Sequence, residues 1–466
     1  MVTTPVRPNL RGGTPSTARA ASTAASASKR SVPAALRALK PAPRPGAGRD
    51  GRSGAAGKRT GATARPGSQT AARTKGNSSL RRFFREFWPR VEGSNRPSNG
   101  SSYYLILGAT LALTCVGLMM VLSSSAVEVI SQGKDPYNLF LRESAFGAFG
   151  VVLMFVLSRT SIRRLKKLAW PALLLAIVLL AMVIFTPLGE SVGGNRNWLR
   201  IGGFSAQPSE AAKLALALWM AAVLARKGTL ILQWKHAIIP VVPAAAVVIG
   251  LVLLGHDLGT SVILMGIVAA GLYFGGARAR LFIPAGVFGV LAAVVLALTS
   301  SNRTSRISGW MGNCDDGNDL CLQARNGLYA LASGGWWGVG LGQSRQKWNW
   351  IPEAHNDFIF AIIGEELGLL GTLVVVLLYG ILAVAIFRVI VRHRDPFIRI
   401  VCGCIMAWII GQAFVNIAMV TGLLPVIGVP LPLISNGGSA LTLVLAAVGV
   451  VLSFARSRPE SEKIPS

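Results

Sequence analysis

Charged residues are scarce in this 466-residue chain. Asp, Glu, Lys and Arg make up 14% of it, against about 25% in ordinary globular domains, and 52% of its residues are hydrophobic. These values exclude a soluble globular protein for most of the chain and place it in a lipid bilayer. The signatures GxxxxGK(S/T) of phosphate-binding loops and HExxH of zinc proteases are also absent. Cys402 and Cys404 make a poor metal site, because residues two apart on a helix point to different faces.

Basic charge is concentrated in the first 102 residues. They hold 20 of the 47 Lys and Arg but only three acidic residues. Residues 1–80 are mainly Ala, Gly, Ser, Thr, Pro and Arg and lack the apolar core of a secretory signal peptide. We therefore expect residues 1–102 to form a disordered, basic cytoplasmic tail. Because aromatic residues are absent before Phe83, attraction to anionic lipid is favoured over specific nucleic-acid binding.

The rest of the chain is predicted to be an all-α polytopic membrane protein. Ten apolar runs within residues 103–456 are long enough to cross a hydrocarbon core of about 30 Å. Clusters of Arg and Lys recur in alternate loops, which places both termini, including a short tail at 457–466, in the cytoplasm. The runs cover residues 103–124, 139–158, 168–187, 209–226, 237–254, 258–276, 281–299, 358–390, 398–421 and 436–455.

The loop between the seventh and eighth runs, residues 300–357, is predicted to be extracytoplasmic. Long ordered loops are usually functional. This loop contains several tryptophans, which either belong to an interfacial belt or serve the function of the loop. Its glycine-rich stretch at 334–342 indicates tight turns or close approach of a ligand.

Three carboxylates mark the start of the eighth run. Asp357 stands at its outer end beside His355, and Glu365 and Glu366 follow about two helical turns deeper. An aspartate at this position can be a simple helix cap. Capping leaves the two glutamates unexplained, and ionisable groups in lipid usually mark function. We therefore favour a functional role for this cluster.

A second group of charges opens the fourth and sixth runs from the same outer side. Glu210 and Lys213 share a helix face, and Asp257 is a second candidate partner for the lysine. The pair is either a structural ion pair or a phosphate site, in which Glu210 orients the lysine or binds a divalent cation such as Mg²⁺ or Mn²⁺. Arg196 and Arg200 add cations in the preceding outer loop, and guanidinium groups match the oxygens of a pyrophosphate.

A proline-rich segment interrupts the entry to the last run. Residues 430–439 contain Pro430 and Pro432, followed by Ser435 and Ser439. Broken backbone at membrane depth is tolerated where it lines a polar cavity. The outer face therefore combines acidic and basic groups. Displacement of a sugar from a lipid pyrophosphate requires both: a base for the attacking hydroxyl and cations for the leaving group.

Six motifs, in order, resemble the SEDS family of polytopic membrane glycosyltransferases over about residues 103–456. The form PEAHNDFIF is more similar to the FtsW-type division branch than to the RodA-type elongation branch. The motifs lie at 207–213, 257–260, 340–344, 352–360, 364–368 and 432–439.

The resemblance implies an inverting peptidoglycan glycosyltransferase. It would polymerise lipid II into glycan strands at the outer face of the cytoplasmic membrane, at the division septum, and release undecaprenyl pyrophosphate. Asp357 matches the essential acid of the family and would deprotonate the acceptor hydroxyl, while Lys213, Arg196 and Arg200 would bind the pyrophosphate. The expected supporting residues are Glu210, Asp257, His355, Glu365, Glu366, Ser435 and Ser439.

The resemblance also implies partners. Besides lipid II and the nascent glycan chain, we expect a class B penicillin-binding protein, docked on the eighth and ninth runs through small residues such as Gly380, Gly403 and Gly411. Other division proteins would bind the basic tail, and no nucleic acid is expected. Three alternatives are weighed against this interpretation: a lipid II flippase, a RodA-type elongation polymerase and a scaffold. Charges gathered at one face rather than along a path argue against the flippase, and a scaffold leaves the buried charges without a purpose.

We predict a disulfide between Cys314 and Cys321 in the outer loop, where the compartment permits oxidation. The intervening Gly, Asn and Asp residues turn easily, and the alternative of a calcium-binding loop lacks the EF-hand spacing. The bond should stabilise the loop by about 2–3 kcal/mol. Mass spectrometry of non-reduced peptides from intact membranes tests this prediction, and free thiols at both positions would refute it.

Overall fold

The computed structural model describes residues 100–456, apart from 132–135, 193, 203, 285, 288, 290, 292–300, 312–318 and 348–354. The tail expected at 1–102 lies almost entirely outside these residues, and the tail at 457–466 wholly so. The predicted disulfide also lies outside them, since Cys314 and the side chain of Cys321 are not described. Cys115, Cys402 and Cys404 are free thiols.

The membrane domain is mainly helical, as predicted, and its described spans are helices. Within the described residues, nine helices are long and apolar enough to cross a membrane, and they correspond to nine of the ten predicted runs. The remaining run, 281–299, falls mostly outside the described residues, so the count of ten stays a prediction. The helices are α2 (Ser101–Ser131), α3 (Pro136–Ser158), α4 (Ile162–Phe185), α5 (Pro208–Lys227), α6 (Trp234–Ile238), which precedes α7 (Val241–Leu254) in one span, α8 (Leu258–Gly275), α12 (Ile359–Arg392), α13 (Pro396–Val420) and α14 (Gly438–Arg456).

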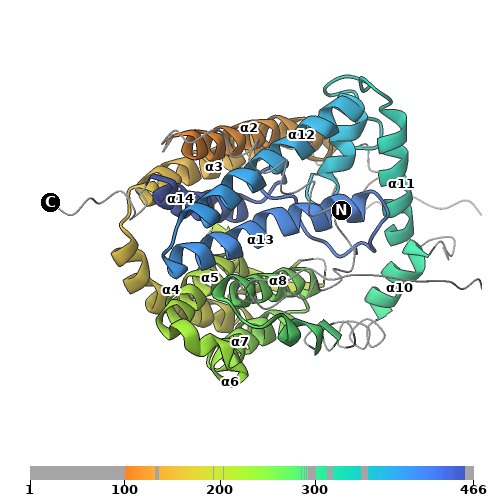
Figure 1. The fold of residues 1–466 in the computed structure, drawn as a ribbon. Coiled ribbons are helices and arrows are strands. Elements are labelled where there is room, and N and C mark those ends of the chain that lie inside the picture. Colours follow the sequence, from red (N-terminus) through yellow and green to blue (C-terminus); the bar gives the residue numbers. More distant parts are fainter. Residues whose placement is uncertain are drawn as a thin grey trace, which may run out of the picture. The chain divides into compact units, whose positions relative to one another are not determined.

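The last helix, α14, is the centre of the membrane domain. In the most apolar 18-residue segment of α14, 83% of the residues are buried inside the protein, whereas in that of α3 only 22% are buried. The two helices pack closely along their length, and Figure 1 shows them beside α2. A Cβ on Gly449 of α14 would lie 2.5 Å from the Met154 carbonyl oxygen of α3, so a small residue is required at this crossing.

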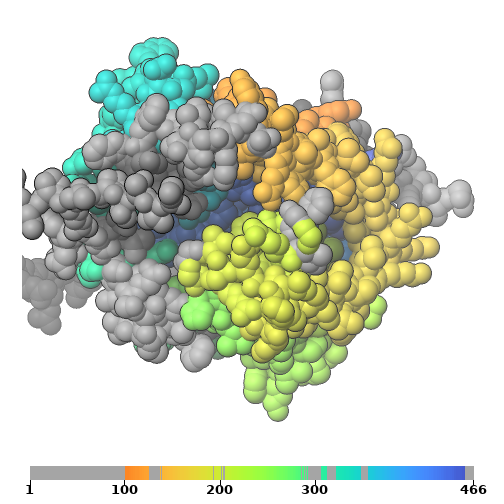
Figure 2. All heavy atoms as spheres, turned by 180° about the vertical axis from the view of Figure 1, so that it is seen from behind, coloured from red at the N-terminus to blue at the C-terminus, as the bar shows by residue number. Residues whose placement is uncertain are grey.

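A small antiparallel sheet between α4 and α5 was missed by the sequence analysis. Its strands, in spatial order, are β1 (Gly189–Val192), β2 (Asn195–Ile201) and β3 (Phe204–Ala206). Gly194 and Gly202, with φ of 82° and 59°, form the two connecting turns. Figure 2 shows a recess between this yellow-green segment and the orange α2, with blue C-terminal residues at its floor.

The long outer loop contains two helices, α10 (Ser301–Trp310) and α11 (Asp319–Ser333). The indole Nε1–H of Trp310 donates to the carbonyl oxygen of Gly422 at 2.8 Å, which ties α10 to the end of α13. Helix α11 packs against α12, and Figure 1 shows α10 and α11 following one another along one side of the bundle. The loop is therefore a folded part of the protein.

Helix α12 is interrupted at Gly368, which has φ 68° and ψ −167°. In an uninterrupted helix, the N–H groups of Leu369 and Leu370 would bond to the carbonyl oxygens of Glu365 and Glu366. Here all four groups bond instead to the glycine-rich stretch 335–340. Leu369 N–H donates to Gly335 O at 2.9 Å, Leu370 N–H to Trp336 O at 3.3 Å, Val339 N–H to Glu365 O at 2.9 Å and Gly340 N–H to Glu366 O at 3.1 Å.

These bonds explain the run of glycines. A Cβ on Gly338 would lie 2.1 Å from the Glu366 carbonyl oxygen, and one on Gly368 would lie 2.4 Å from the Gly338 nitrogen. The sequence of this stretch indicated either tight turns or the close approach of a ligand. The partner that approaches closely is the backbone of α12.

We predict that Gly368→Ala destabilises the protein by at least about 1–3 kcal/mol, since its backbone conformation is one that only glycine adopts readily and the added Cβ overlaps the loop. Gly380→Ala is the matched control in the same helix, because a Cβ there meets no atom within 4 Å. It should be neutral or stabilising by up to about 1 kcal/mol. Thermal unfolding in detergent measures both, and equal melting temperatures for the two variants would contradict the role of Gly368.

Candidate active site

Asp357 lies in a turn, residues 355–358, that leads into α12 at its outer end. The turn is held by the backbone, since the carbonyl oxygens of three successive residues each accept a hydrogen bond from another part of the chain. His355 O accepts from the Asn436 N–H at 3.1 Å, Asn356 O from the Ser435 hydroxyl at 2.6 Å and Asp357 O from the Asn416 amide at 2.8 Å.

The predicted serines hold the segment before α14 in place. The hydroxyl oxygen of Ser435 accepts a hydrogen bond from the Leu431 N–H at 2.8 Å, and the same hydroxyl donates to the carbonyl oxygen of Asn356. Ser439 Oγ accepts the backbone N–H of Gln207 at 3.3 Å, which joins the start of α14 to the start of α5. Ser435 therefore positions the turn of Asp357 through the backbone, whereas Ser439 fixes the start of α14 against α5.

The carboxylate of Asp357 lies beside Gly428, in the connection between α13 and α14. A Cβ on Gly428 would be 3.3 Å from Asp357 Oδ2 and 3.5 Å from Arg306 Nη1 of α10. Arg306 also donates to the carbonyl oxygen of Val426 at 3.3 Å. A guanidinium and the candidate base thus flank one glycine whose φ of 68° and missing side chain leave room for both.

Lys213 is buried near the start of α5, with 1% of its surface exposed. Its Nζ donates to Glu210 Oε1 at 2.6 Å and to Gln412 Oε1 of α13 at 2.9 Å, and it lies 5.3 Å from the centre of the Trp408 ring. These contacts surround the ammonium with protein groups. The geometry is that of a structural ion pair within α5, which a hydrogen bond to Gln412 ties to α13, and it matches the first of the two alternatives.

Asp257 was expected as a second partner of Lys213, but its described contacts are elsewhere. It caps α8 and ties that helix to the sheet. The hydrogen bonds to its carboxylate offset the cost of burying the charge. Its oxygens accept from Thr260 N–H at 2.9 Å, Thr260 Oγ1 at 2.8 Å, Asn197 Nδ2 at 2.9 Å and Gln207 Nε2 at 3.3 Å.

The two arginines of β2 bind groups of the outer loop between α4 and α5. Arg196 donates through Nη2 to the carbonyl oxygen of Thr186 at 2.7 Å. The exposed Arg200 pairs with Glu190 of β1, with Nε 3.0 Å from Oε2. Arg196, Arg200 and Lys213 therefore each have a protein partner of their own, and their common role at a pyrophosphate stays a prediction.

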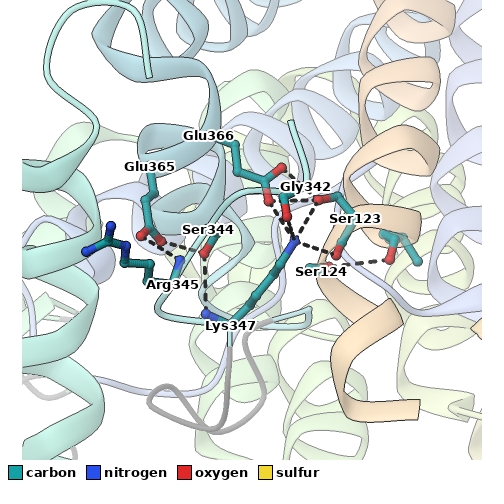
Figure 3. Close-up of polar contacts among 9 residues, drawn as sticks. Ser123, Ser124, Gly342, Ser344, Arg345, Lys347, Glu365 and Glu366 are labelled. Carbon is teal, nitrogen blue, oxygen red and sulfur yellow. Dashed lines mark hydrogen bonds and ion pairs between the residues drawn. The ribbon is translucent and has the colours of Figure 1, made fainter. Parts of the chain in front are cut away.

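Glu365 binds the loop that follows the glycine-rich stretch. Its side chain is 2% exposed, its Oε2 accepts from the Ser344 hydroxyl at 2.5 Å, and its Oε1 accepts from the Arg345 backbone N–H at 2.9 Å. Figure 3 shows this carboxylate directed at the loop. Glu365 therefore fixes the outer loop and supports the site at a distance.

Glu366 joins three elements. Its carboxylate accepts from Lys347 Nζ at 3.1 Å and from the Ser123 hydroxyl of α2 at 2.7 Å. Lys347 also donates to the carbonyl oxygens of Gly342 at 2.8 Å and Ser123 at 3.2 Å (Figure 3). This buried network links α2, the outer loop and α12 just before the break.

A divalent cation near Glu210 remains untested. The second carboxylate oxygen of Glu210, Oε2, is buried and has no hydrogen-bond partner within the described part of the chain. In that same part, no three His, Cys, Asp or Glu side chains gather closely enough to hold a metal ion. This oxygen would supply one ligand to Mg²⁺ or Mn²⁺, whose octahedral set is usually completed by water and substrate phosphate oxygens.

Residues 103–460 match the model of the FtsW, RodA and SpoVE family, described as "Cell cycle protein". The chain belongs to this family. It is 39% identical over 362 residues to the Mycobacterium tuberculosis protein named "Probable peptidoglycan glycosyltransferase FtsW", across 78% of this chain and 69% of that protein. It is 35% identical to "Stage V sporulation protein E" of Bacillus subtilis, across 76% and 96% of the two chains.

Solved structures agree with this assignment. A chain from "Structural coordination of polymerization and crosslinking by a peptidoglycan synthase complex" superposes with a TM-score of 0.63 at 28% identity, over 75% of this chain and 96% of that one. The Thermus thermophilus rod shape determining protein RodA superposes with a TM-score of 0.57 at 26% identity, over 76% and 96%. The multi-pass helical fold of this family member is therefore shared with RodA.

Three buried or half-buried charges of this family member were missed by the sequence analysis. Arg306 and Lys347 lie in the outer loop and are distant in sequence from the α2 and α13–α14 residues that they contact. Glu143 of α3 is 3% exposed and accepts the Gly437 N–H at 3.2 Å, next to the segment that holds the Asp357 turn. The sequence could have indicated a role for Glu143, because it is a charged residue inside a predicted membrane span.

We predict that Lys213→Met destabilises the protein by about 3–5 kcal/mol, because it leaves Glu210 buried without its counter-charge. Adding Glu210→Gln should recover most of that loss. The control is Lys166→Met, which breaks the partly exposed pair with Asp395 (3.1 Å) and should cost about 0–1 kcal/mol.

Thermal melts and lipid II polymerisation are measured on the same preparations. If the double variant regains stability and activity, the pair is structural. If it regains stability and stays inactive, Lys213 acts on the substrate and the structural interpretation is wrong.

Proposed function

We propose that this protein is a peptidoglycan glycosyltransferase that polymerises lipid II at the outer face of the cytoplasmic membrane. The observation that carries the proposal is the half-buried Asp357, held on a fixed turn at the outer end of α12 beside a guanidinium. The names of the relatives, and the polymerisation named for one structural neighbour, support the same chemistry.

In the proposed reaction, Asp357 removes the proton from the acceptor hydroxyl of lipid II. The oxygen attacks the anomeric carbon of the donor chain, the bond to the pyrophosphate breaks, and the configuration inverts. Undecaprenyl pyrophosphate leaves with the electron pair of that bond. A positioned general base suits this step because the hydroxyl becomes a nucleophile only as its proton departs.

The charge of the departing pyrophosphate requires cations. We propose two guanidinium groups for this role: Arg306, which lies near Asp357 and donates to the Val426 carbonyl oxygen, and the exposed Arg200, which pairs with Glu190. Lys213 and Arg196 are occupied by protein partners and would act after rearrangement, or only through the fold. A divalent cation bound at the free oxygen of Glu210 would add to these charges, and the proposed steps are written for the side chains alone.

The FtsW-type role implies a class B penicillin-binding protein as partner and the division septum as the location, and we propose both. The crosslinking complex named for the structural neighbour supports such a partner. Within the surface expected on α12 and α13, Gly380 and Gly411 are open, whereas a Cβ on Gly403 would lie 2.1 Å from the Phe274 ring. Gly403 therefore packs against α8 and does not belong to a partner surface.

We predict that Asp357→Asn lowers lipid II polymerisation by about 10²–10⁴-fold, the usual loss on removing a general base. The change preserves shape, and the bonds to the turn are made by backbone oxygens, so expression and melting temperature should stay normal. Gel analysis of glycan chains from labelled lipid II measures the loss.

Asp395→Asn is the matched control, because this aspartate caps α13 on the opposite side of the membrane domain. It should cost some stability and leave polymerisation close to that of the unaltered protein. Near-normal polymerisation by the Asp357→Asn variant would overturn the assignment of the base.

A further inference from the structure

A pocket of about 670 Å³ lies at the end of the membrane domain remote from Asp357. It opens where α3 turns into α4 and where α14 ends, on the side that the Arg and Lys pattern assigns to the cytoplasm. Its lining residues are mostly polar, and none of them is acidic: Ser158, Arg159, Thr160, Ser161, Ile162, Ser453 and Arg456.

The pocket carries positive charge from three directions. Arg159 follows α3, Arg456 ends α14, and both side chains are exposed. The 24-residue helix α4 begins at Ile162, and its N-cap Ser161 makes no side-chain capping bond, so the first N–H groups of the helix face the pocket without that acceptor. The nearby acid Asp395 is already paired with Lys166 at 3.1 Å. An anionic ligand is favoured here.

The hydroxyl groups of the pocket are acceptors. Ser158, Thr160 and Ser453 donate their protons to carbonyl oxygens of their own helices, at 2.7, 3.3 and 2.7 Å. Their oxygens keep lone pairs that accept hydrogen bonds. A ligand with a phosphate group would bind the arginines of the lining, and hydroxyl groups on the same ligand would donate to the serine and threonine oxygens.

An apolar surface continues from the pocket along α3. Val152, Phe155 and Val156 are 59%, 38% and 58% exposed, and they lie seven, four and three residues before Arg159. These spacings place them on the helix face where Arg159 stands. In a membrane, that face meets the acyl chains of the inner leaflet.

We propose that this pocket binds the headgroup of an anionic glycerophospholipid of the phosphatidylglycerol type. The phosphate contacts Arg159, Arg456 and the start of α4, and the glycerol hydroxyls donate to the serine and threonine oxygens. The acyl chains lie along Val152, Phe155 and Val156. Basic pockets between transmembrane helices on the cytoplasmic side recognise such headgroups. The bound lipid holds the end of α14 against the α3–α4 turn.

The test is native mass spectrometry of the full-length protein released from mixed phosphatidylglycerol and phosphatidylcholine nanodiscs. The variant Arg159→Gln/Arg456→Gln should retain phosphatidylglycerol about tenfold or more less than the unaltered chain, since each arginine contributes to headgroup binding. The matched control is Arg278→Gln/Arg280→Gln, two exposed arginines on the same side but outside the pocket. It removes the same charge and leaves the basic tail untouched, so its retention should stay within about twofold of the unaltered chain.

A melting series in detergent provides the second readout. Added phosphatidylglycerol should raise the melting temperature of the unaltered chain and of the control, and should not raise that of the pocket variant. Equal loss of lipid in both double variants would mean that only the general basic charge attracts it. Equal retention of phosphatidylcholine would mean an apolar groove without headgroup recognition. Displacement of the lipid by inorganic phosphate at millimolar concentration would mean a site for soluble phosphates. Each of these three results overturns the proposal.

Discussion

A break in a buried helix leaves backbone donors and acceptors that must find partners, and the outer half of this protein is arranged around one such break. Where α12 is interrupted at Gly368, the two lost helical bonds are replaced by four bonds to residues 335–340. An unpaired backbone group away from water costs about as much as a lost hydrogen bond. The glycine-rich stretch therefore docks in one register, and the position of the rest of the outer loop follows from it.

The acidic residues beside the break fix that loop further. Glu365 and Glu366 sit in the last turn before Gly368, so their side chains point to the loop as it leaves the break. Each carboxylate is buried and each binds a different part of the loop, and Glu366 adds the hydroxyl of Ser123 on α2. Buried ion pairs contribute little net stability because desolvation offsets the attraction. The Lys347–Glu366 pair favours this docking of the loop, because a docking that separated the two residues would leave a buried charge without its partner.

The spans could be predicted from the sequence because hydropathy reflects one property, the transfer of side chains to lipid. The predicted start of α8 agrees with the structure, and the membrane span within α3 begins at the predicted Leu139, whereas α4 begins six residues before the predicted 168. Its first turns contain Arg163, Arg164, Lys166 and Lys167, which lower hydropathy although long cationic side chains can extend from a helix to the interface. The sheet was not predicted because its strands are short, and the first two contain charged residues without a clear alternation of polar and apolar side chains.

The sequence also located the site better than it predicted its contacts. Ser435 bonds to the backbone next to Asp357, whereas Ser439 bonds to Gln207, Asp257 caps α8 and Arg200 pairs with Glu190. Charges clustered along the chain or on one membrane face do not determine which of them meet. Ser123 and Glu366 are 243 residues apart, and their pairing depends on how α2 packs against α12. Such contacts follow from helix packing, which short motifs do not encode.

Helix α14 connects the two ends of the membrane domain. Its start follows the segment whose Ser435 and Asn436 hold the Asp357 turn, and its end forms one wall of the cytoplasmic pocket. Between them the helix is packed against α3 so closely that Gly449 has no room for a side chain. A well-packed interior transmits displacement because it is hard to compress. A ligand that holds Arg456 against the α3–α4 turn therefore acts on a helix whose other end supports the candidate base. The proposed lipid site in one leaflet and the candidate base at the other are thus connected by the buried helix α14.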